Sequence, residues 1–215
     1  MRGGNFMTKI ILADDQPAII SGTRQYIEQM PGFTVVATAS STAELSERLL
    51  DTPCDLLITE FSLPINRIGR GCALFRQLKS NYPTLGLIVL TMIDIPAVLY
   101  QITNCGVKGL VHKSDEISEL GRAMLEGSHA APYIGKAALQ LLKKGPSGRL
   151  PTRREAEVLK MYVVGNSLRE IADRLNKSVK TVGLQKASAM RKMGLRNDIE
   201  LGRYSCTMGR IGQPF

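Results

Sequence analysis

Residues 55–64 read DLLITEFSLP, and this stretch decides the fold. Its residues 56–59 are four apolar or β-branched residues in a row, which is typical of a short strand buried on both faces of a parallel sheet. The predicted strand ends at the carboxylate of Glu60. In open α/β sheets, ligands bind just beyond the carboxyl ends of the strands. The stretch therefore predicts a charged functional position at Glu60.

The same alternation of short apolar runs and helical patterns continues through residues 7–144. The predicted strands are residues 9–13, 33–38, 55–59, 85–90 and 107–112, and the predicted helices are residues 17–30, 42–50, 71–81, 96–105 and 115–126. Five strands alternating with five helices indicate the α/β class, with a doubly wound, five-stranded parallel sheet.

Polar side chains follow four of the five predicted strands. They are Asp14 and Asp15 after the first strand, Glu60 after the third, Thr91 after the fourth and Lys113 after the fifth. Taken singly, each is as well explained by a solvated turn or a helix cap. Parallel strands bring all five to one edge, where three carboxylates need a cation and oxygen ligands suit Mg²⁺. A hydroxyl and an ammonium beside them suit a phosphoryl group or another anion.

Charge divides the chain of 215 residues into two parts. Net charge is +9 overall, but residues 146–215 hold 14 Lys and Arg against 6 Asp and Glu, a net charge of +8. We therefore predict a first domain at residues 7–128, a helical linker at 129–149 and a basic domain at 150–215 that faces a polyanion. The alternative is a solvated domain that is simply rich in Lys and Arg.

Other classes are disfavoured by composition. No apolar run approaches the roughly 18 residues of a membrane span, and the first residues lack the apolar segment of a secretory signal. The four cysteines, Cys54, Cys72, Cys105 and Cys206, form no CxxC pair. This spacing disfavours a disulfide framework and a zinc site, and it favours buried thiols in a reducing cytoplasm.

The basic part carries a dense set of helix-start signals. Four helices are predicted at about 153–164, 168–175, 179–192 and 198–206, with breaks at Gly165, Asn176 and Gly194. Capping patterns precede them: Thr152 with Glu155, Ser167 with Glu170, Ser178, and Asn197 with Glu200. Only residues 176–178 separate the second helix from the third, which indicates a helix-turn-helix.

The second helix of a helix-turn-helix enters the major groove of double-stranded DNA, where cations bind phosphates and Gln reads adenine edges. An ordinary solvated basic face is the alternative. Gly183 costs roughly 1 kcal/mol against Ala within a helix. It either lets the backbone approach DNA closely or removes a base contact. The candidate DNA contacts are Lys177, Ser178, Lys180, Thr181, Gly183, Leu184, Gln185, Lys186, Arg191 and Lys192.

Residues 8–127, with these strand-end groups, resemble the receiver domain of two-component response regulators. In that family an aspartate ending the third strand accepts a phosphoryl group from a histidine kinase, and Pro64 matches a proline of the following loop. The resemblance implies that Asp14 and Asp15 hold Mg²⁺ and that Thr91 and Lys113 contact the phosphoryl group.

Two positions depart from the receiver pattern. Glu60 stands where the family has the acceptor aspartate, and its extra methylene displaces the carboxylate in a reaction that depends on placement within a fraction of an ångström. Glu60 is also an imperfect mimic of the phosphorylated state, because it has one charge where a phosphate has nearly two. Leu110 stands where the family usually has a switch aromatic, three residues before the lysine.

Residues 150–204 resemble the LuxR/NarL-type DNA-binding domain. The motifs are REAEVL at 154–159, EIA at 170–172 and KTV at 180–182. KTVGLQKASAMRKMGLRNDIEL, LTMIDIPAVL and the length of the 62–71 loop are most similar to the capsule-regulator, or RcsB-like, subgroup. These resemblances imply a cytoplasmic transcription regulator, not an enzyme, that binds DNA as a homodimer or with a related partner.

Glu60 then indicates a regulator that works without aspartyl phosphorylation. Two alternatives stay open. One is a conventional phosphorelay-controlled regulator served by a histidine kinase. The other is an auxiliary subunit that acts by heterodimerising with another regulator.

Overall fold

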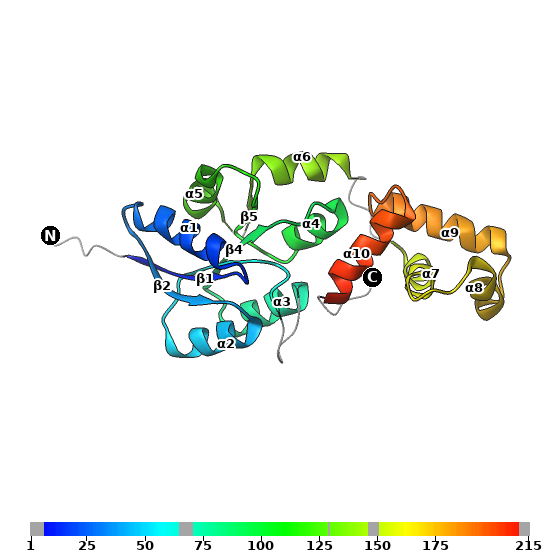
Figure 1. Cartoon of the computed structure of the whole chain (residues 1–215), viewed down its shortest axis with the longest axis horizontal. Coiled ribbons are helices and arrows are strands. Elements are labelled where there is room, and N and C mark those ends of the chain that lie inside the picture. The colour runs from blue at the N-terminus through cyan, green and yellow to red at the C-terminus, as the bar shows by residue number, and fades with distance from the viewer. Residues whose placement is uncertain (1–6, 65–70, 129, 146–150, 211–215) are drawn as a thin grey trace. The chain divides into compact units, whose positions relative to one another are not determined.

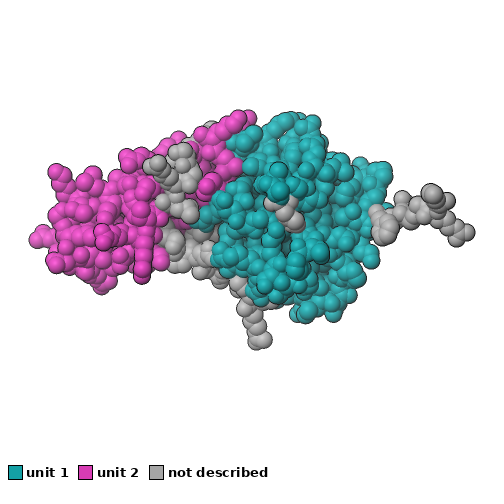
Figure 2. Space-filling view, turned by 180° about the vertical axis from the view of Figure 1, so that it is seen from behind, with its two compact units in different colours: residues 1–93, 101–139 teal, residues 94–100, 140–215 magenta. Residues whose placement is uncertain are grey.

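The computed structural model describes residues 7–64, 71–128, 130–145 and 151–210 (Figure 1). Two compact units divide the chain, one of residues 1–93 and 101–139 and the other of residues 94–100 and 140–215 (Figure 2). Within the described ranges, every helix is too short or too polar to cross a membrane.

The first unit is built on one parallel sheet with the strand order β2-β1-β3-β4-β5-β6. Its strands are β1 (Thr8–Ala13), β2 (Phe33–Ala39), β3 (Leu56–Thr59), β4 (Gly86–Thr91), β5 (Gly109–His112) and β6 (Tyr133–Ile134). The predicted α/β class and the parallel doubly wound order are confirmed.

The prediction of five strands is wrong by one, because β6 extends the sheet at its edge. Gly109 pairs with Tyr133 and Leu110 with Ile134, in parallel register with β5. Two residues are too few to show a strand pattern in the sequence. Tyr133 and Ile134 are recognised as a strand only because their backbone pairs with that of β5.

Helices cover both faces of the sheet. They are α1 (Pro17–Glu28), α2 (Thr42–Asp51), α3 (Cys72–Asn81), α4 (Pro96–Thr103) and α5 (Ile117–Glu126). Helices α1 and α5 lie side by side on one face, and α2 and α3 lie on the other (Figure 1). Strand residues therefore alternate between two apolar layers. Ile10, Ile58 and Ile88 pack with Ile27 of α1 and Leu120 of α5 in one of them.

Helix α6 (Lys136–Lys144) follows β6, and residues 129 and 146–149 of the predicted linker lie outside the described residues. The basic part then forms α7 (Arg153–Val163), α8 (Leu168–Leu175), α9 (Val179–Lys192) and α10 (Asp198–Arg210). All four predicted helices are confirmed, with α10 ending four residues later than predicted.

The capping boxes at Thr152–Glu155 and Ser167–Glu170 are both present, and Ser178 accepts a hydrogen bond from the backbone N–H of Thr181. Asn176 ends α8 in the left-handed conformation, with φ of 50°. These local signals set the helix ends, because each satisfies backbone groups that the helix itself leaves unpaired.

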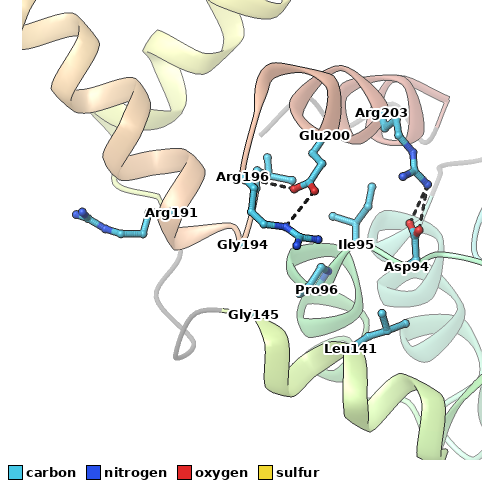
Figure 3. A pocket seen from close by; sticks show the side chains of 11 residues that line it. Asp94, Ile95, Pro96, Leu141, Gly145, Arg191, Gly194, Arg196, Glu200 and Arg203 are labelled. Carbon is cyan, nitrogen blue, oxygen red and sulfur yellow. Dashed lines mark hydrogen bonds and ion pairs between the residues drawn. The ribbon is translucent and has the colours of Figure 1, made fainter.

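The start of α10 differs slightly from the predicted cap. The side chain of Asn197 accepts a hydrogen bond from the backbone N–H of Glu200 at 2.9 Å, as predicted. The carboxylate of Glu200 returns to the backbone N–H of Arg196 and pairs with the Arg196 guanidinium (Figure 3). The reciprocal bond therefore reaches one residue further back than in a capping box.

The helix-turn-helix has its own small core. Val158 of α7, Ile171 and Ala172 of α8 and Val182 of α9 are buried together, with Leu175 packed against them. These residues come from three helices, so the angle at which α9 leaves α8 is set by packing as well as by the short turn.

Candidate functional site

The parallel register brings four of the predicted strand-end residues into one buried pocket. Asp14 follows β1, Glu60 follows β3, Thr91 ends β4 and Lys113 follows β5. Ala13 pairs with Thr59 and Thr91 pairs with His112, so these strands end almost level with one another. We call Asp14, Glu60, Thr91 and Lys113 the acidic pocket.

The ammonium of Lys113 lies between the two carboxylates of the pocket. Its Nζ is 2.6 Å from Oδ2 of Asp14 and 3.0 Å from Oε2 of Glu60. The three side chains are only 2%, 4% and 6% exposed for Lys113, Asp14 and Glu60. One ammonium offsets part of the charge of the two carboxylates, so these buried groups depend on one another.

The pocket shifts the ionisation of its members. Burial raises the pKa of the Asp14 carboxyl, although the hydrogen bond from Lys113 acts in the opposite direction. Burial alone would lower the pKa of the Lys113 ammonium, but its contacts with Asp14 and Glu60 outweigh burial and raise that pKa. Lys113 is therefore a permanently charged partner of the carboxylates at neutral pH.

The second carboxylate oxygen of Glu60 is held as firmly as the first. Oε1 accepts hydrogen bonds from the Thr91 hydroxyl at 2.6 Å, from the Phe61 backbone N–H at 2.7 Å and from the Ser62 backbone N–H at 3.2 Å. Both oxygens thus have partners, and the side chain is fixed at the centre of the pocket. The two backbone donors carry no signal in the sequence.

Of the three predicted carboxylates, the structure places two, Asp14 and Glu60, in the acidic pocket. Asp14 points inward and also accepts a hydrogen bond from the backbone N–H of Gln16 at 2.9 Å, whereas Asp15 is exposed. Strand β1 ends at Ala13, and the chain bends at Asp15 before α1 begins. The described residues hold no group of three or more His, Cys, Asp or Glu side chains placed to bind a metal ion.

The predicted DNA-contact residues divide into three sets. One set is exposed and follows a stripe along α9 and the turn before it: Ser178, Lys180, Thr181, Leu184 and Arg191. Lys180, Leu184 and Arg191 lie at positions i, i+4 and i+11, which place them on one helix face. We call this exposed set the α9 face. Leu184 is 64% exposed although it is apolar.

The second set is partly buried and is engaged within the unit. The Lys186 ammonium pairs with Asp198 and lies 3.7 Å from the centre of the Tyr162 ring. The Lys192 ammonium lies 2.7 Å and 2.9 Å from the two carboxylate oxygens of Glu155. These two lysines connect α9 to the helices beside it, a role that sequence analysis missed because the partners are distant in the chain.

The third set lies in the turn before α9 and in the first half of that helix. The Lys177 ammonium donates to the Gln185 side-chain oxygen at 3.2 Å. Gly183 is half-buried, and a Cβ added there would meet only Leu168 Cδ1, at 3.9 Å. Internal packing therefore does not require a glycine at position 183.

Comparison with known proteins gives matches to both parts of the chain. The family model of the response regulator receiver domain matches residues 10–125, and that of the bacterial regulatory proteins of the luxR family matches residues 151–205. The transcriptional regulatory protein RcsB of Salmonella typhi is 34% identical over 199 residues, which cover 91% of this chain and 92% of RcsB. RcsB of Escherichia coli K12 gives the same figures.

Solved structures agree with these relatives. RcsB from Salmonella enterica serovar Typhimurium bound to the promoter rprA has a TM-score of 0.83 and 34% identity, covering 94% of this chain and 99% of that one. A structure of two RcsB dimers bound to two parallel DNAs has a TM-score of 0.83 and 33% identity, covering 94% and 98%. The chain therefore belongs to the family of response regulators in which a receiver domain is followed by a LuxR-type helix-turn-helix domain.

Proposed function

We propose that the protein is a transcription regulator that binds promoter DNA as a dimer in the cytoplasm, and that it acts by binding and not as an enzyme. The observation that carries this proposal is the α9 face, which presents Lys180, Thr181 and Arg191 to solvent on the second helix of a helix-turn-helix. One RcsB structure holds two dimers bound to two parallel DNAs, and another holds RcsB bound to the promoter rprA in the presence of phosphomimetic BeF3⁻, which supports the same use here.

The α9 face supplies both kinds of contact that sequence-selective binding needs. Among the described residues, Lys180 and Arg191 lack the inward ion pairs that hold Lys186 and Lys192, so they are available to DNA phosphates. Leu184 and Thr181 offer an apolar side chain and a methyl group with a hydroxyl, which suit contacts with base edges such as the thymine methyl. We assign Lys186 and Lys192 to holding α9 in place.

We further propose that this regulator works independently of aspartyl phosphorylation, because Glu60 takes the acceptor position. By resemblance, Thr91 and Lys113 are the groups that contact a phosphoryl oxygen in receivers. Here the Glu60 carboxylate already holds both of them, at 2.6 Å and 3.0 Å. A carboxylate that occupies these partners supports a receiver fixed in one state.

Mg²⁺, which the family implies, does not fit the pocket as it is arranged. Asp14 and Glu60 are bridged by an ammonium, and Asp15 is exposed. A cation would have to displace Lys113 from two buried carboxylates. We therefore derive no step of the function through Mg²⁺.

The proposal is tested by binding measurements on the full-length protein. Preferred sites are first selected from random double-stranded DNA, and the affinity for the selected sequence is compared with that for a scrambled one. The titration is repeated after treatment with acetyl phosphate and Mg²⁺, for the wild type and for Glu60→Asp. We expect specific binding by the wild type that acetyl phosphate leaves unchanged, and a phosphodonor response only in Glu60→Asp.

Other results would favour the alternatives. Wild-type binding that requires acetyl phosphate, with a phosphoryl group mapped to residue 60 by mass spectrometry, would establish a conventional phosphoswitch. Failure to select any sequence with the purified protein, together with selection once a related regulator is added, would establish an auxiliary subunit.

A further inference from the structure

Two thiols that are 33 positions apart in the chain meet within the first unit. Cys72 is the first residue of α3, and Cys105 lies in the turn between α4 and β5. The Cys72 sulfur lies 3.7 Å from the backbone carbonyl oxygen of Gln101, and the Cys105 sulfur lies 3.2 Å from the same oxygen. Both thiols therefore approach the same acceptor oxygen.

The surroundings make the two sulfurs unequal. The hydrogen bond from Cys105 lowers the pKa of the Cys72 thiol, and the nearby Arg76 guanidinium acts in the same direction against the effect of burial. The first turn of a helix, where Cys72 lies, also favours a thiolate. The same hydrogen bond, together with burial, raises the pKa of Cys105. Cys72 is thus the group that loses its proton first, while Cys105 keeps its own.

We propose that Cys72 and Cys105 form a peroxide-sensitive modification site, in which the two thiols close into a reversible disulfide. The Cys72 thiolate attacks one oxygen of hydrogen peroxide, the O–O bond breaks, and a sulfenic acid and hydroxide form. The Cys105 sulfur then attacks the sulfenic sulfur, and its proton leaves with the displaced hydroxide as water. Two thiols and one peroxide yield one disulfide and two waters, and a small dithiol reverses the reaction.

The position of the pair suits a small oxidant. Cys72 is 6% exposed and Cys105 is half-buried, so the pair lies directly beneath the surface. Both sulfurs already contact the carbonyl oxygen of Gln101, so the two thiols start close to each other. A disulfide forms when the sulfurs come to about 2 Å and the Cα atoms lie within roughly 7 Å.

The cross-link has a defined place in the fold. It joins the start of α3, the helix that follows β3, to the turn that leads into β5. Glu60 follows β3 and Lys113 follows β5, so the disulfide would connect the segments that carry these two residues of the acidic pocket. The proposal goes beyond the proposed function and does not depend on DNA binding.

The test is peptide mapping of the full-length protein after treatment with equimolar hydrogen peroxide, followed by alkylation and digestion with trypsin without reduction. A Cys72–Cys105 disulfide joins the peptide of residues 71–76 to the peptide of residues 80–108. We expect this linked pair to appear with peroxide and to disappear after dithiothreitol. In Cys105→Ser, we expect dimedone to label Cys72 as a sulfenic acid.

Cys54 provides a matched control within the same unit. Its thiol is also half-buried, but burial raises its pKa to about 11, so it should remain reduced at the same peroxide concentration. Cys54→Ser should leave the linked pair intact. Oxidation of Cys54 as fast as that of Cys72 would overturn the proposal. The proposal would also be overturned if alkylating reagent reaches Cys72 in the wild-type protein but peroxide produces no linked pair of peptides.

Discussion

The ammonium of Lys113 lies 3.0 Å from the Glu60 carboxylate, and each side chain is the other's partner in the acidic pocket. Removing one buried charge from such a group leaves the others without compensation. We expect Lys113→Met to lower the free energy of unfolding by about 3–5 kcal/mol, because Asp14 and Glu60 then remain buried without a cation. Urea denaturation followed by circular dichroism measures the change.

Lys9→Met is the control for Lys113→Met, because Lys9 is an exposed lysine on β1. Its effect should stay within about 0.5 kcal/mol. Adding Glu60→Gln to Lys113→Met should recover part of the stability, since one uncompensated carboxylate is removed. Equal effects of Lys113→Met and Lys9→Met would contradict the pocket as a coupled group.

Glu155 should make the helix-turn-helix sensitive to acid. Burial would raise the pKa of this carboxyl, but the Lys192 ammonium and the Thr152 backbone N–H outweigh burial and lower it to about 2. Because the folded pKa is depressed, the stabilisation is present above the ordinary value of 4.5 and is lost as pH falls from 4.5 towards 2. It amounts to at most about 3 kcal/mol.

The measurement is hydrogen exchange of the α7 and α9 amides in Glu155→Gln and wild type, compared at the same pH. We expect the variant to lose protection at pH 7 and the difference to shrink as pH approaches 3. Glu157→Gln, which alters an exposed acid on the same helix, should leave protection unchanged at both values. A difference that does not depend on pH would show that the ion pair with Lys192 is not its source.

Substitutions at Lys180 and Lys186 should distinguish a lysine that contacts DNA from a lysine that holds α9 in place. Lys180→Met should weaken binding to all DNA sequences alike and reduce the slope of log affinity against log salt by about 1, because one phosphate contact is lost. Lys186→Met should leave that slope unchanged and destabilise the unit, because Lys186 is paired with Asp198. Titrations at several salt concentrations give the slopes. A reduced slope in Lys186→Met would return this lysine to the DNA-contact set.

Gly183 should limit stability and favour DNA binding. Gly183→Ala should stabilise the unit by roughly 0.5–1 kcal/mol, since alanine is the better helix former and the added methyl has room. We expect weaker DNA binding in spite of this gain, because the methyl keeps the α9 backbone away from DNA. Gly202→Ala is a matched control on α10, where nothing lies within 4 Å of an added Cβ. Gly202→Ala should gain similar stability and leave the affinity for DNA unchanged. If Gly183→Ala binds DNA as tightly as the wild type, Gly183 has no role in bringing the α9 backbone close to DNA.

Much of the secondary structure could be predicted from short stretches of sequence. Strand and helix order, the break at Asn176 and the capping residues Thr152, Ser167 and Ser178 were readable from sequence, because each depends on neighbouring residues or on a short period. The meeting of Asp14, Glu60, Thr91 and Lys113 was also predictable, since parallel strands must bring their carboxyl ends to one edge.

Only the tertiary structure decided which of these groups act together. The sequence could not say that Asp15 turns outward, that β6 completes the sheet, or that Lys186 and Lys192 face inward while Lys180 and Arg191 face solvent. The pairing of β6 and the ion pairs of Lys186 and Lys192 depend on partners in other elements of the fold, which the sequence does not place. By itself, the sequence determined the two-part fold and placed a glutamate directly after the third strand. The packed pocket determined that this glutamate is held by Lys113 and Thr91, because burial leaves a carboxylate stable only where every oxygen has a partner.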